Sequence, residues 1–356
     1  MAVQALDITE FLQRAQQHPV LDVRSPSEFA HARIPGALSL PLFTDEERKV
    51  VGTAYKQQSR EMAIKIGLDY FGGKMRRMVE TVEALLRQPP YKGSRTLLVH
   101  CWRGGMRSAG VAWLLDLYGW EVYTLKGGYK AFRRWALEQL EQPYPLRILG
   151  GYTGSGKTEV LQALQQAGAV VIDLEALAHH KGSAFGNIGM PPQPSQEHFE
   201  NLLALQLHQS RQRLLQPVSG DPVIWLEDES QRLGDVNIPI GFWRQMRQQP
   251  VWFLEIPFEE RLQHIVQEYG KLDRERLVNA IIRIRKRLGG LETREAIHAL
   301  VEDRIEDSFR ILLRYYDKWY DKGLHNRDNL PALLRRIHCS RVTAENYRLL
   351  LQHQHN

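Results

Sequence analysis

The chain has 356 residues, of which 43% are hydrophobic and 25% are charged, and its formal net charge is +6 at pH 7. These proportions are those of a folded globular protein, and only the last few residues are expected to be disordered. The presence of only two cysteines excludes a disulfide framework and a thiolate zinc cluster. No apolar run approaches the roughly 20 residues of a bilayer-spanning helix, so we expect a cytoplasmic protein without a membrane partner.

Residues 1–140 alternate short apolar segments with helical ones. We predict strands over residues 20–23, 38–40, 97–100 and 121–125, and helices over residues 27–32 and 108–118. Strands that alternate with helices indicate an α/β domain with a mostly parallel sheet.

The strand over residues 97–100 leads directly into the loop Cys-Trp-Arg-Gly-Gly-Met-Arg-Ser at residues 101–108. Its two glycines allow successive backbone N–H groups to converge, and the following helix adds the positive end of its dipole. Such donors, with Arg103 and Arg107 beside them, lower a cysteine pKa from about 8.5 into the range of roughly 3.5 to 7.5. We therefore predict that Cys101 is a nucleophile at neutral pH. Cys339 has no glycine loop and is interpreted as structural, or at most as a resolving thiol.

The segment Gln-Pro-Tyr-Pro at residues 142–145 separates the first domain from a second α/β domain over residues 141–257. Apolar strands are predicted there at residues 146–149, 169–172, 223–226 and 251–256. Beyond residue 258 the chain is expected to be helical to its end at residue 356. The length is sufficient for two domains with separate cores.

A complete Walker A motif, Gly-Tyr-Thr-Gly-Ser-Gly-Lys-Thr, lies between the first of these strands and a helix over residues 159–166. In this context the backbone amides wrap a di- or triphosphate, Lys157 neutralises phosphate oxygens, and the Thr158 hydroxyl reaches Mg²⁺. The predicted phosphate-binding residues are Gly151, Gly154, Ser155, Gly156, Lys157 and Thr158.

The acid that completes such a Mg²⁺ site belongs at the end of a neighbouring strand. Three carboxylates, beginning with Glu227 and Asp228, follow the strand over residues 223–226, and Asp173 follows the strand over residues 169–172. We favour Glu227 or Asp228, which the sequence does not separate.

Residues 179–187 are polar and interrupted by glycines. The adjacent His179 and His180 have no Cys or Asp at ligand spacing, so we predict no fixed metal site from them. The segment is either a loop that contacts substrate or an ordinary surface loop.

Basic residues are concentrated in the helical region. From Lys271 to Leu350 the chain has 18 Lys and Arg against 12 Asp and Glu. The excess of basic residues in this segment equals the net charge of the whole protein, +6. The cluster consists of Arg283, Arg285, Lys286 and Arg287, and Tyr315, Tyr316, Trp319 and Tyr320 follow it. Basic side chains among aromatic ones suit RNA binding, because they pair with phosphates and stack on bases. A solvated helix face with aromatics in the core is the alternative.

The first domain resembles the rhodanese family. The resemblance is carried by Asp-Val-Arg-Ser-Pro-Ser-Glu-Phe at residues 22–29, His-Ala-Arg-Ile-Pro-Gly-Ala at 31–37, the Cys101 loop and the glycines 127 and 128. It implies a cysteine that carries sulfur or selenium as a persulfide or selenopersulfide. Counted from Cys101 to Arg107, the loop has seven residues, one more than the usual six of single-domain sulfurtransferases. It also fits the cysteine phosphatase pattern His-Cys-x-x-Gly-x-x-Arg-Ser.

A rhodanese domain fused to a Walker A domain with this loop is similar to the bacterial tRNA 2-selenouridine synthases over essentially the whole chain. The resemblance implies that selenium from selenophosphate replaces the sulfur of wobble 2-thiouridine in tRNA, after S-geranylation by geranyl diphosphate. It implies a supplier of selenophosphate as a further requirement, beside the Mg²⁺ predicted at the Walker A motif. On this hypothesis the Walker A loop grips the diphosphate, the Cys101 loop holds the selenium species with Arg103 and Arg107 on its phosphate, and the basic helices hold the tRNA.

Two other functions remain open from the residues alone. The cysteine-to-arginine spacing fits a rhodanese-fold phosphatase with an attached nucleotide-binding domain, although no aspartate is assignable as its general acid. An ATP-driven RNA-binding module with a purely structural rhodanese half is the second alternative.

Overall fold

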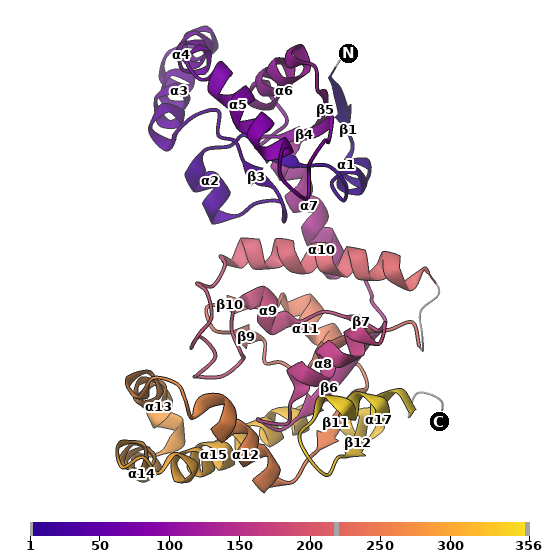
Figure 1. The fold of residues 1–356 in the computed structure, drawn as a ribbon, viewed down its shortest axis with the longest axis vertical. Coiled ribbons are helices and arrows are strands. Elements are labelled where there is room, and N and C mark those ends of the chain that lie inside the picture. Colours follow the sequence, from indigo (N-terminus) through magenta and orange to yellow (C-terminus); the bar gives the residue numbers. More distant parts are fainter. Residues whose placement is uncertain (1–2, 217–220, 353–356) are drawn as a thin grey trace. The chain divides into compact units, whose positions relative to one another are not determined.

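The computed structural model describes residues 3–216 and 221–352, and the chain divides into two compact units, Met1–Glu138 and Gln139–Asn356 (Figure 1). Among the described residues, no helix is long and apolar enough to cross a membrane.

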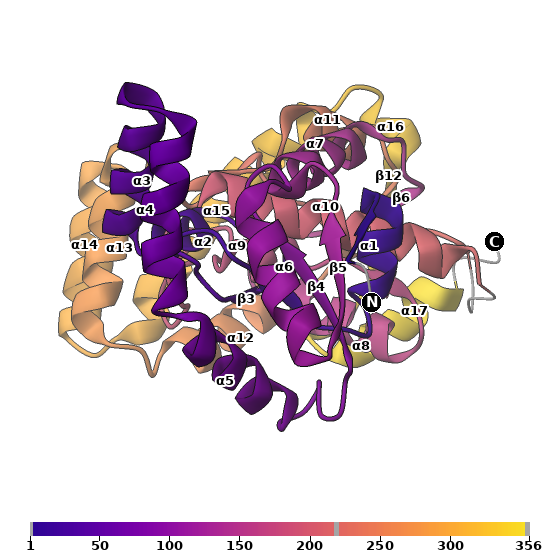
Figure 2. The same ribbon diagram turned by 90° about the horizontal axis from the view of Figure 1, so that it is seen from above.

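The first unit is built on a five-stranded parallel sheet with the strand order β1-β5-β4-β2-β3. The strands are β1 (Gln4–Leu6), β2 (Val20–Asp22), β3 (Leu38–Ser39), β4 (Thr96–His100) and β5 (Glu121–Leu125). The helices are α1 (Ile8–Arg14), α2 (Pro26–His31), α3 (Asp45–Gln57), α4 (Arg60–Gly72), α5 (Met75–Leu86), α6 (Met106–Tyr118) and α7 (Gly128–Glu141). All five residues of β4 are buried, and α6 lies against β4 and β5 (Figure 2). β4 is the middle strand of the sheet, so Cys101, the residue after His100, lies at the end of a buried central strand.

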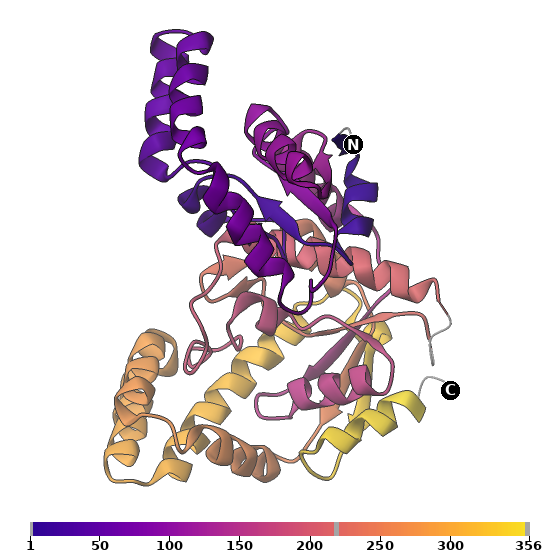
Figure 3. The same ribbon diagram turned by 45° about the horizontal axis from the view of Figure 1, so that its top comes forward.

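The helices α3 and α4 form a hairpin that extends beyond the sheet of this unit (Figure 3). We predicted no element in this segment. The Thr44 hydroxyl accepts a hydrogen bond from the Glu47 amide, and the Glu47 carboxylate accepts one from the Thr44 amide, which is the reciprocal capping box that starts a helix. The Ser59 hydroxyl caps α4 by accepting a single hydrogen bond from the Met62 amide.

The second unit contains a parallel sheet with the order β12-β11-β6-β8-β7. Its strands are β6 (Leu146–Gly151), β7 (Val170–Val171), β8 (Ile224–Glu227), β11 (Val251–Glu255) and β12 (Leu334–His338), beside a hairpin of β9 (Arg232–Leu233) and β10 (Val236–Asn237). The helices are α8 (Lys157–Gln166), α9 (Leu174–Ala178), α10 (Gln196–Leu214), α11 (Ile240–Arg247), α12 (Phe258–Tyr269), α13 (Arg274–Leu288), α14 (Gly290–Val301), α15 (Ile305–His325), α16 (Leu330–Leu333), the 3₁₀ helix η1 (Ala344–Asn346) and α17 (Tyr347–Gln352). The mixed α/β class and the helical C-terminal region agree with the sequence-based prediction.

One strand departs from the prediction that the chain is helical beyond residue 258. β12 pairs with β11 along its whole length, so the late part of the chain completes the sheet that carries the Walker A loop. Residues 141–257 and 258–356, which we expected as separate regions, therefore share one compact unit. The strand was missed because only Ile337 of its five residues is buried, as is usual at a sheet edge.

Candidate functional sites

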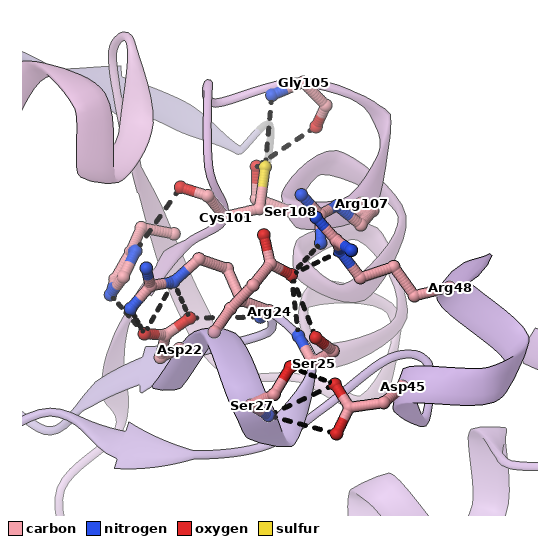
Figure 4. A network of polar contacts seen from close by, with 12 residues as sticks. Asp22, Arg24, Ser25, Ser27, Asp45, Arg48, Cys101, Gly105, Arg107 and Ser108 are labelled. Atoms are coloured by element: carbon pink, nitrogen blue, oxygen red, sulfur yellow. Dashed lines mark hydrogen bonds and ion pairs between the residues drawn. The ribbon is translucent and has the colours of Figure 1, made fainter. Parts of the chain in front are cut away.

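Cys101 follows β4 at the start of the loop that leads into α6. Its side chain is 3% exposed, and its Sγ accepts a hydrogen bond of 3.4 Å from the Gly105 amide (Figure 4). The Sγ also lies 3.2 Å from the Ser108 hydroxyl. The loop thus surrounds the sulfur with donors, as the sequence predicted.

These donors determine the charge of the thiol. Burial raises the pKa of Cys101, but the hydrogen bond from the Ser108 hydroxyl and those from the amides of Arg103, Gly105 and Ser108 outweigh burial and hold the pKa below its ordinary value. The arrangement therefore favours the thiolate form of Cys101. The same donors are suited to bind an anionic ligand.

The glycines of this site allow two backbone segments to approach closely. A Cβ added at Gly128 would lie 2.3 Å from the carbonyl oxygen of Cys101, and both Gly104 and Gly128 have positive φ. The contact is held by the amide of Tyr129, which donates to the Cys101 carbonyl at 2.8 Å. The start of α7 thereby fixes the shape of the Cys101 loop.

A buried ion pair supports the loop from below. The Arg24 guanidinium donates to Asp22 through both Nε and Nη2, and both side chains are almost fully buried. Arg24 also stacks 3.9 Å from the centre of the Tyr129 ring, and His100 Nε2 lies 3.6 Å from Asp22. The Asp-Val-Arg segment thus supports the reactive loop without contacting the Cys101 sulfur, a role that its sequence did not reveal.

The two predicted arginines of the loop take different positions. Arg107 Nη1 donates to Glu28 Oε2 at 3.0 Å, and Arg48 pairs with the same carboxylate (Figure 4). Arg103 is exposed and contributes its amide to the thiol. In this structure the charge at Sγ is therefore balanced by amides and a hydroxyl, whereas the Arg107 guanidinium is committed to Glu28.

The Walker A residues form the loop between β6 and α8. Gly154 and Gly156 have positive φ, and a Cβ on Gly154 would lie 2.9 Å from the Arg261 carbonyl oxygen. Lys157 Nζ donates to the Gly151 carbonyl at 3.1 Å. The Ser155 hydroxyl is buried and has no hydrogen-bond partner among the described residues. An unsatisfied donor here fits a phosphate oxygen as its missing partner.

The three candidate acids of this site have different hydrogen-bond partners in the structure. The Thr158 hydroxyl donates to Glu227 Oε1 at 2.9 Å, and Glu227 is buried. Asp228 accepts a hydrogen bond from Tyr320 at 2.8 Å and pairs with Arg327. Asp173 caps α9 through the amide of Ala176. Of the three, only Glu227 is bonded to the hydroxyl expected to bind Mg²⁺.

Two further glutamates join Glu227: Glu229, the third carboxylate after the strand over residues 223–226, and Glu175, which the sequence did not indicate. Carboxylate oxygens of Glu175, Glu227 and Glu229 lie within 4.8 Å of one another. Burial raises the pKa of each, and repulsion from neighbouring carboxylates adds to the rise, which reaches about 10 for Glu175 and about 8 for Glu229. Oxygen ligands suit Mg²⁺, and a bound cation would allow these groups to ionise.

The Walker A loop opens into a cleft of about 610 Å³. Lys181, Gly182 and Ser183 line it, so part of the polar segment 179–187 lies at this site. Arg287 and Trp319 line it as well, and the Arg287 guanidinium lies 5.4 Å from the Trp319 ring centre.

The rest of the predicted RNA-binding set is only partly gathered at this cleft. Arg285 and Lys286 are exposed on α13 outside the cleft lining, and Arg283 bonds to Asn187 at 3.4 Å. Tyr315, Tyr316 and Tyr320 are half-buried and line the cleft as well, and burial raises the pKa of Tyr320. Cys339 is buried, and burial raises its pKa to about 11, in agreement with a structural thiol.

Comparison with known proteins assigns both halves of the chain. Residues 144–337 match the family model of the tRNA 2-selenouridine synthase AAA domain, and residues 7–134 match the rhodanese-like domain. A tRNA 2-selenouridine synthase from Hydrogenovibrio crunogenus is 38% identical over 342 residues, which span 87% of this chain and 90% of that protein. The chain belongs to the tRNA 2-selenouridine synthase family.

A second relative agrees with this assignment, and one solved structure is similar to part of the chain. A tRNA 2-selenouridine synthase from Pseudomonas putida is 34% identical over 88% of this chain and 91% of its own length. The solved N-terminal domain of a Clostridium difficile protein is 34% identical over 38% of this chain and 99% of that domain, with a TM-score of 0.34. The rhodanese match contains the Cys101 loop, and the tRNA 2-selenouridine synthase AAA match contains the Walker A loop and the basic cluster on α13.

Proposed function

We propose that this protein replaces the sulfur of wobble 2-thiouridine in tRNA with selenium, through S-geranylation and then selenation, in the cytoplasm. The observation that carries the proposal is the presence of two preformed anion sites, the Cys101 loop and the Walker A loop, in one chain of this family. A thione sulfur leaves a pyrimidine C2 poorly, whereas an alkylated sulfur leaves readily. The two anion sites therefore suit the two steps, the Walker A loop for geranylation and the Cys101 loop for selenation.

The first step is assigned to the Walker A loop. The thiouridine sulfur attacks C1 of geranyl diphosphate, a C–S bond forms, the C1–O bond breaks, diphosphate leaves and the N3 proton passes to solvent. Lys157, the loop amides and the unpaired Ser155 hydroxyl would hold the departing diphosphate. Thr158 and Glu227, with Glu175 and Glu229 nearby, would hold Mg²⁺, whose charge stabilises the diphosphate.

The second step is assigned to the Cys101 loop. Selenium from selenophosphate forms a bond to C2, the C2–S bond breaks, geranylthiolate leaves and takes a proton, and water cleaves the Se–P bond to give phosphate. The balance is redox-neutral. The loop amides that lower the pKa of Cys101 would bind the selenium donor, and Arg103 and Arg107 would bind its phosphate once Arg107 leaves Glu28. A selenophosphate-producing enzyme is the required supplier.

The tRNA would bind to the basic residues of α13 beside the Walker A cleft. Arg287 lies with Trp319 at the cleft, which offers a guanidinium for phosphate and a ring for stacking. Arg283, Arg285 and Lys286 extend the positive charge along the same helix.

Mass spectrometry of nucleosides tests the two-site assignment. The protein is incubated with 2-thiouridine tRNA, geranyl diphosphate and selenophosphate, and wild type is compared with Cys101→Ala, Lys157→Ala and the control Cys339→Ala. We expect selenouridine from wild type and the control, S-geranyl product alone from Cys101→Ala, and neither product from Lys157→Ala. Absence of both products with wild type would reject the proposal, and aryl phosphate hydrolysis would then favour a cysteine phosphatase.

A further inference from the structure

The first unit contains an apolar groove that the two anion sites do not use. It has a volume of about 840 Å³ and lies between the α3–α4 hairpin and α6. Its lining includes Val51, Leu68, Phe71, Met106, Gly110 and Trp113. The volume falls within the range of roughly 300 to 1,000 Å³ that is typical of ligand pockets.

Large apolar side chains are left open to solvent in this groove. Leu68 is 58% exposed, Met106 is 55% exposed and Trp113 is 52% exposed. Several exposed apolar side chains along one groove indicate a binding surface, because burying them against a ligand would remove them from water.

The groove begins beside the Cys101 loop. Met106 and Arg107 form the first turn of α6, directly after the loop, and both line the groove. Gly110 and Trp113 continue the lining along the same helix, at spacings that place them on one face. An apolar chain in the groove would therefore have one end next to the reactive sulfur and run away from it along α6.

We propose that this groove binds the isoprenyl chain of the S-geranylated wobble nucleoside during selenation. The inference rests on the proposed function and assigns the location of one of its groups. When C2 of the nucleoside faces the Cys101 loop, the sulfur and its geranyl chain must occupy space that adjoins the loop, and this groove supplies apolar space there. After the C2–S bond breaks, the geranylthiol departs from the same groove.

Charge at the rim favours an occupant attached to RNA. Arg48, Lys49, Lys56 and Arg107 all line the groove. Arg48 and Arg107 share Glu28, whereas no acid among the described residues pairs with Lys49 or Lys56. An apolar chain that is linked to a polyanion matches an apolar floor with a basic rim.

Binding of three anticodon stem-loop RNAs to the full chain tests this inference. The RNAs carry S-geranyl-2-thiouridine, S-methyl-2-thiouridine or 2-thiouridine, and fluorescence anisotropy gives each affinity. We expect wild type to bind the geranylated RNA at least about tenfold more tightly than the methylated one, the equivalent of burying about two methylene groups.

Two glycine variants test whether the preference for geranylated RNA arises in the groove. Gly52 lies on α3 in the groove lining, and a Cβ there meets nothing within 4 Å, so Gly52→Phe fills the groove without a backbone clash. Gly72 on α4 has equally open surroundings and lies outside the lining, so Gly72→Phe is the matched control. Gly52→Phe should abolish the geranyl preference and leave the affinity for methylated RNA unchanged, whereas Gly72→Phe should keep the preference.

Introduction of a charge on the apolar surface gives a second, independent pair of variants. Leu68→Glu should also remove the preference, and Leu117→Glu should not, because Leu117 is 68% exposed on α6 outside the groove lining. Retention of the geranyl preference by Gly52→Phe and Leu68→Glu would overturn the inference. A wild type that modifies tRNA without a geranyl preference would overturn it while leaving the proposed function intact. A Gly52→Phe protein that loses a dimer in gel filtration would assign the groove to a second copy of the chain.

Discussion

The Thr158 hydroxyl donates to Glu227 at 2.9 Å, and the next residue along the chain, Asp228, is held instead by Tyr320 and Arg327. Side chains of neighbouring residues in an extended chain point in opposite directions, so the two carboxylates contact different groups. Glu227 faces the Walker A loop, and Asp228 pairs with Tyr320 on α15 and with Arg327 just after that helix.

Glu227→Gln should impair catalysis while preserving the fold. The amide retains the size of the side chain but removes the charge that would hold Mg²⁺ beside Thr158. We expect geranylation to fall by about 100-fold, as when one electrostatic contact to a transition state is lost. Steady-state rates at several Mg²⁺ concentrations check this, and a rate equal to that of wild type at every concentration would contradict the role of Glu227.

Asp228→Asn should instead lower stability. The carboxylate is mostly buried against Arg327, so neutralising it leaves a buried guanidinium without its counter-ion. Breaking a buried pair costs about 3 to 5 kcal/mol. Urea unfolding followed by circular dichroism measures the loss, and Glu227→Gln serves as the control that should not show it.

Ser108→Ala should raise the pKa of Cys101. The hydroxyl is the strongest of the groups that lower this pKa against burial, so its removal shifts thiolate formation to higher pH. The rate of iodoacetamide alkylation against pH reports the midpoint, which should lie below the ordinary value of about 8.5 in wild type and move upward in the variant. Cys339 should stay silent near neutral pH, because burial raises its pKa to about 11. Identical midpoints in the two proteins would show that Ser108 does not stabilise the thiolate.

Asp22→Asn should remove an acid-sensitive part of the stability. Burial opposes ionisation of Asp22, but the attractions of His100 and Arg24 hold its pKa below the ordinary value. A lowered pKa gives stability that is present above the unfolded value and is lost as pH falls below about 4. Thermal unfolding from pH 3 to 7 should show a steeper acid loss for wild type than for Asp22→Asn, which is less stable at pH 7. Parallel curves would contradict this account.

Arg287→Ala should weaken tRNA binding in a salt-dependent manner. If Arg287 contacts a phosphate at the Walker A cleft, its removal lowers the slope of log affinity against log salt by about one. Filter binding at several salt concentrations measures the slope. Arg276→Ala, an exposed arginine of the same helix outside the cleft lining, is the matched control and should leave the slope unchanged.

The two reactive loops were predictable because their chemistry is local. The glycines and donors that lower the pKa of Cys101 lie within a few residues of it, and the Walker A motif contains its own lysine and hydroxyl. The choice between Glu227 and Asp228 was not local, since it depends on the register that places Glu227 opposite Leu149 of β6.

Groups that meet only in the folded chain escaped prediction. Glu175 lies on α9 and Glu229 follows β8, with helix α10 between them in the sequence, so no spacing indicates their contact. The capping box at Thr44 was a readable signal for α3, but the groove also requires the hairpin to lie across α6. The ion pair between Arg107 and Glu28 likewise depends on how α2 packs against α6, which the sequence alone does not indicate.

The pairing of β11 with β12 sets an order for folding during synthesis. All five strands of the first sheet have been made once Leu125 is added, whereas the second sheet lacks β12 until His338, about 200 residues later. At roughly 5 to 20 residues per second, this delay is about 10 to 40 s. The unit that carries Cys101 can close its sheet while the second unit still exposes an open strand edge. Nascent chains of this protein should therefore depend on chaperones chiefly through their second half.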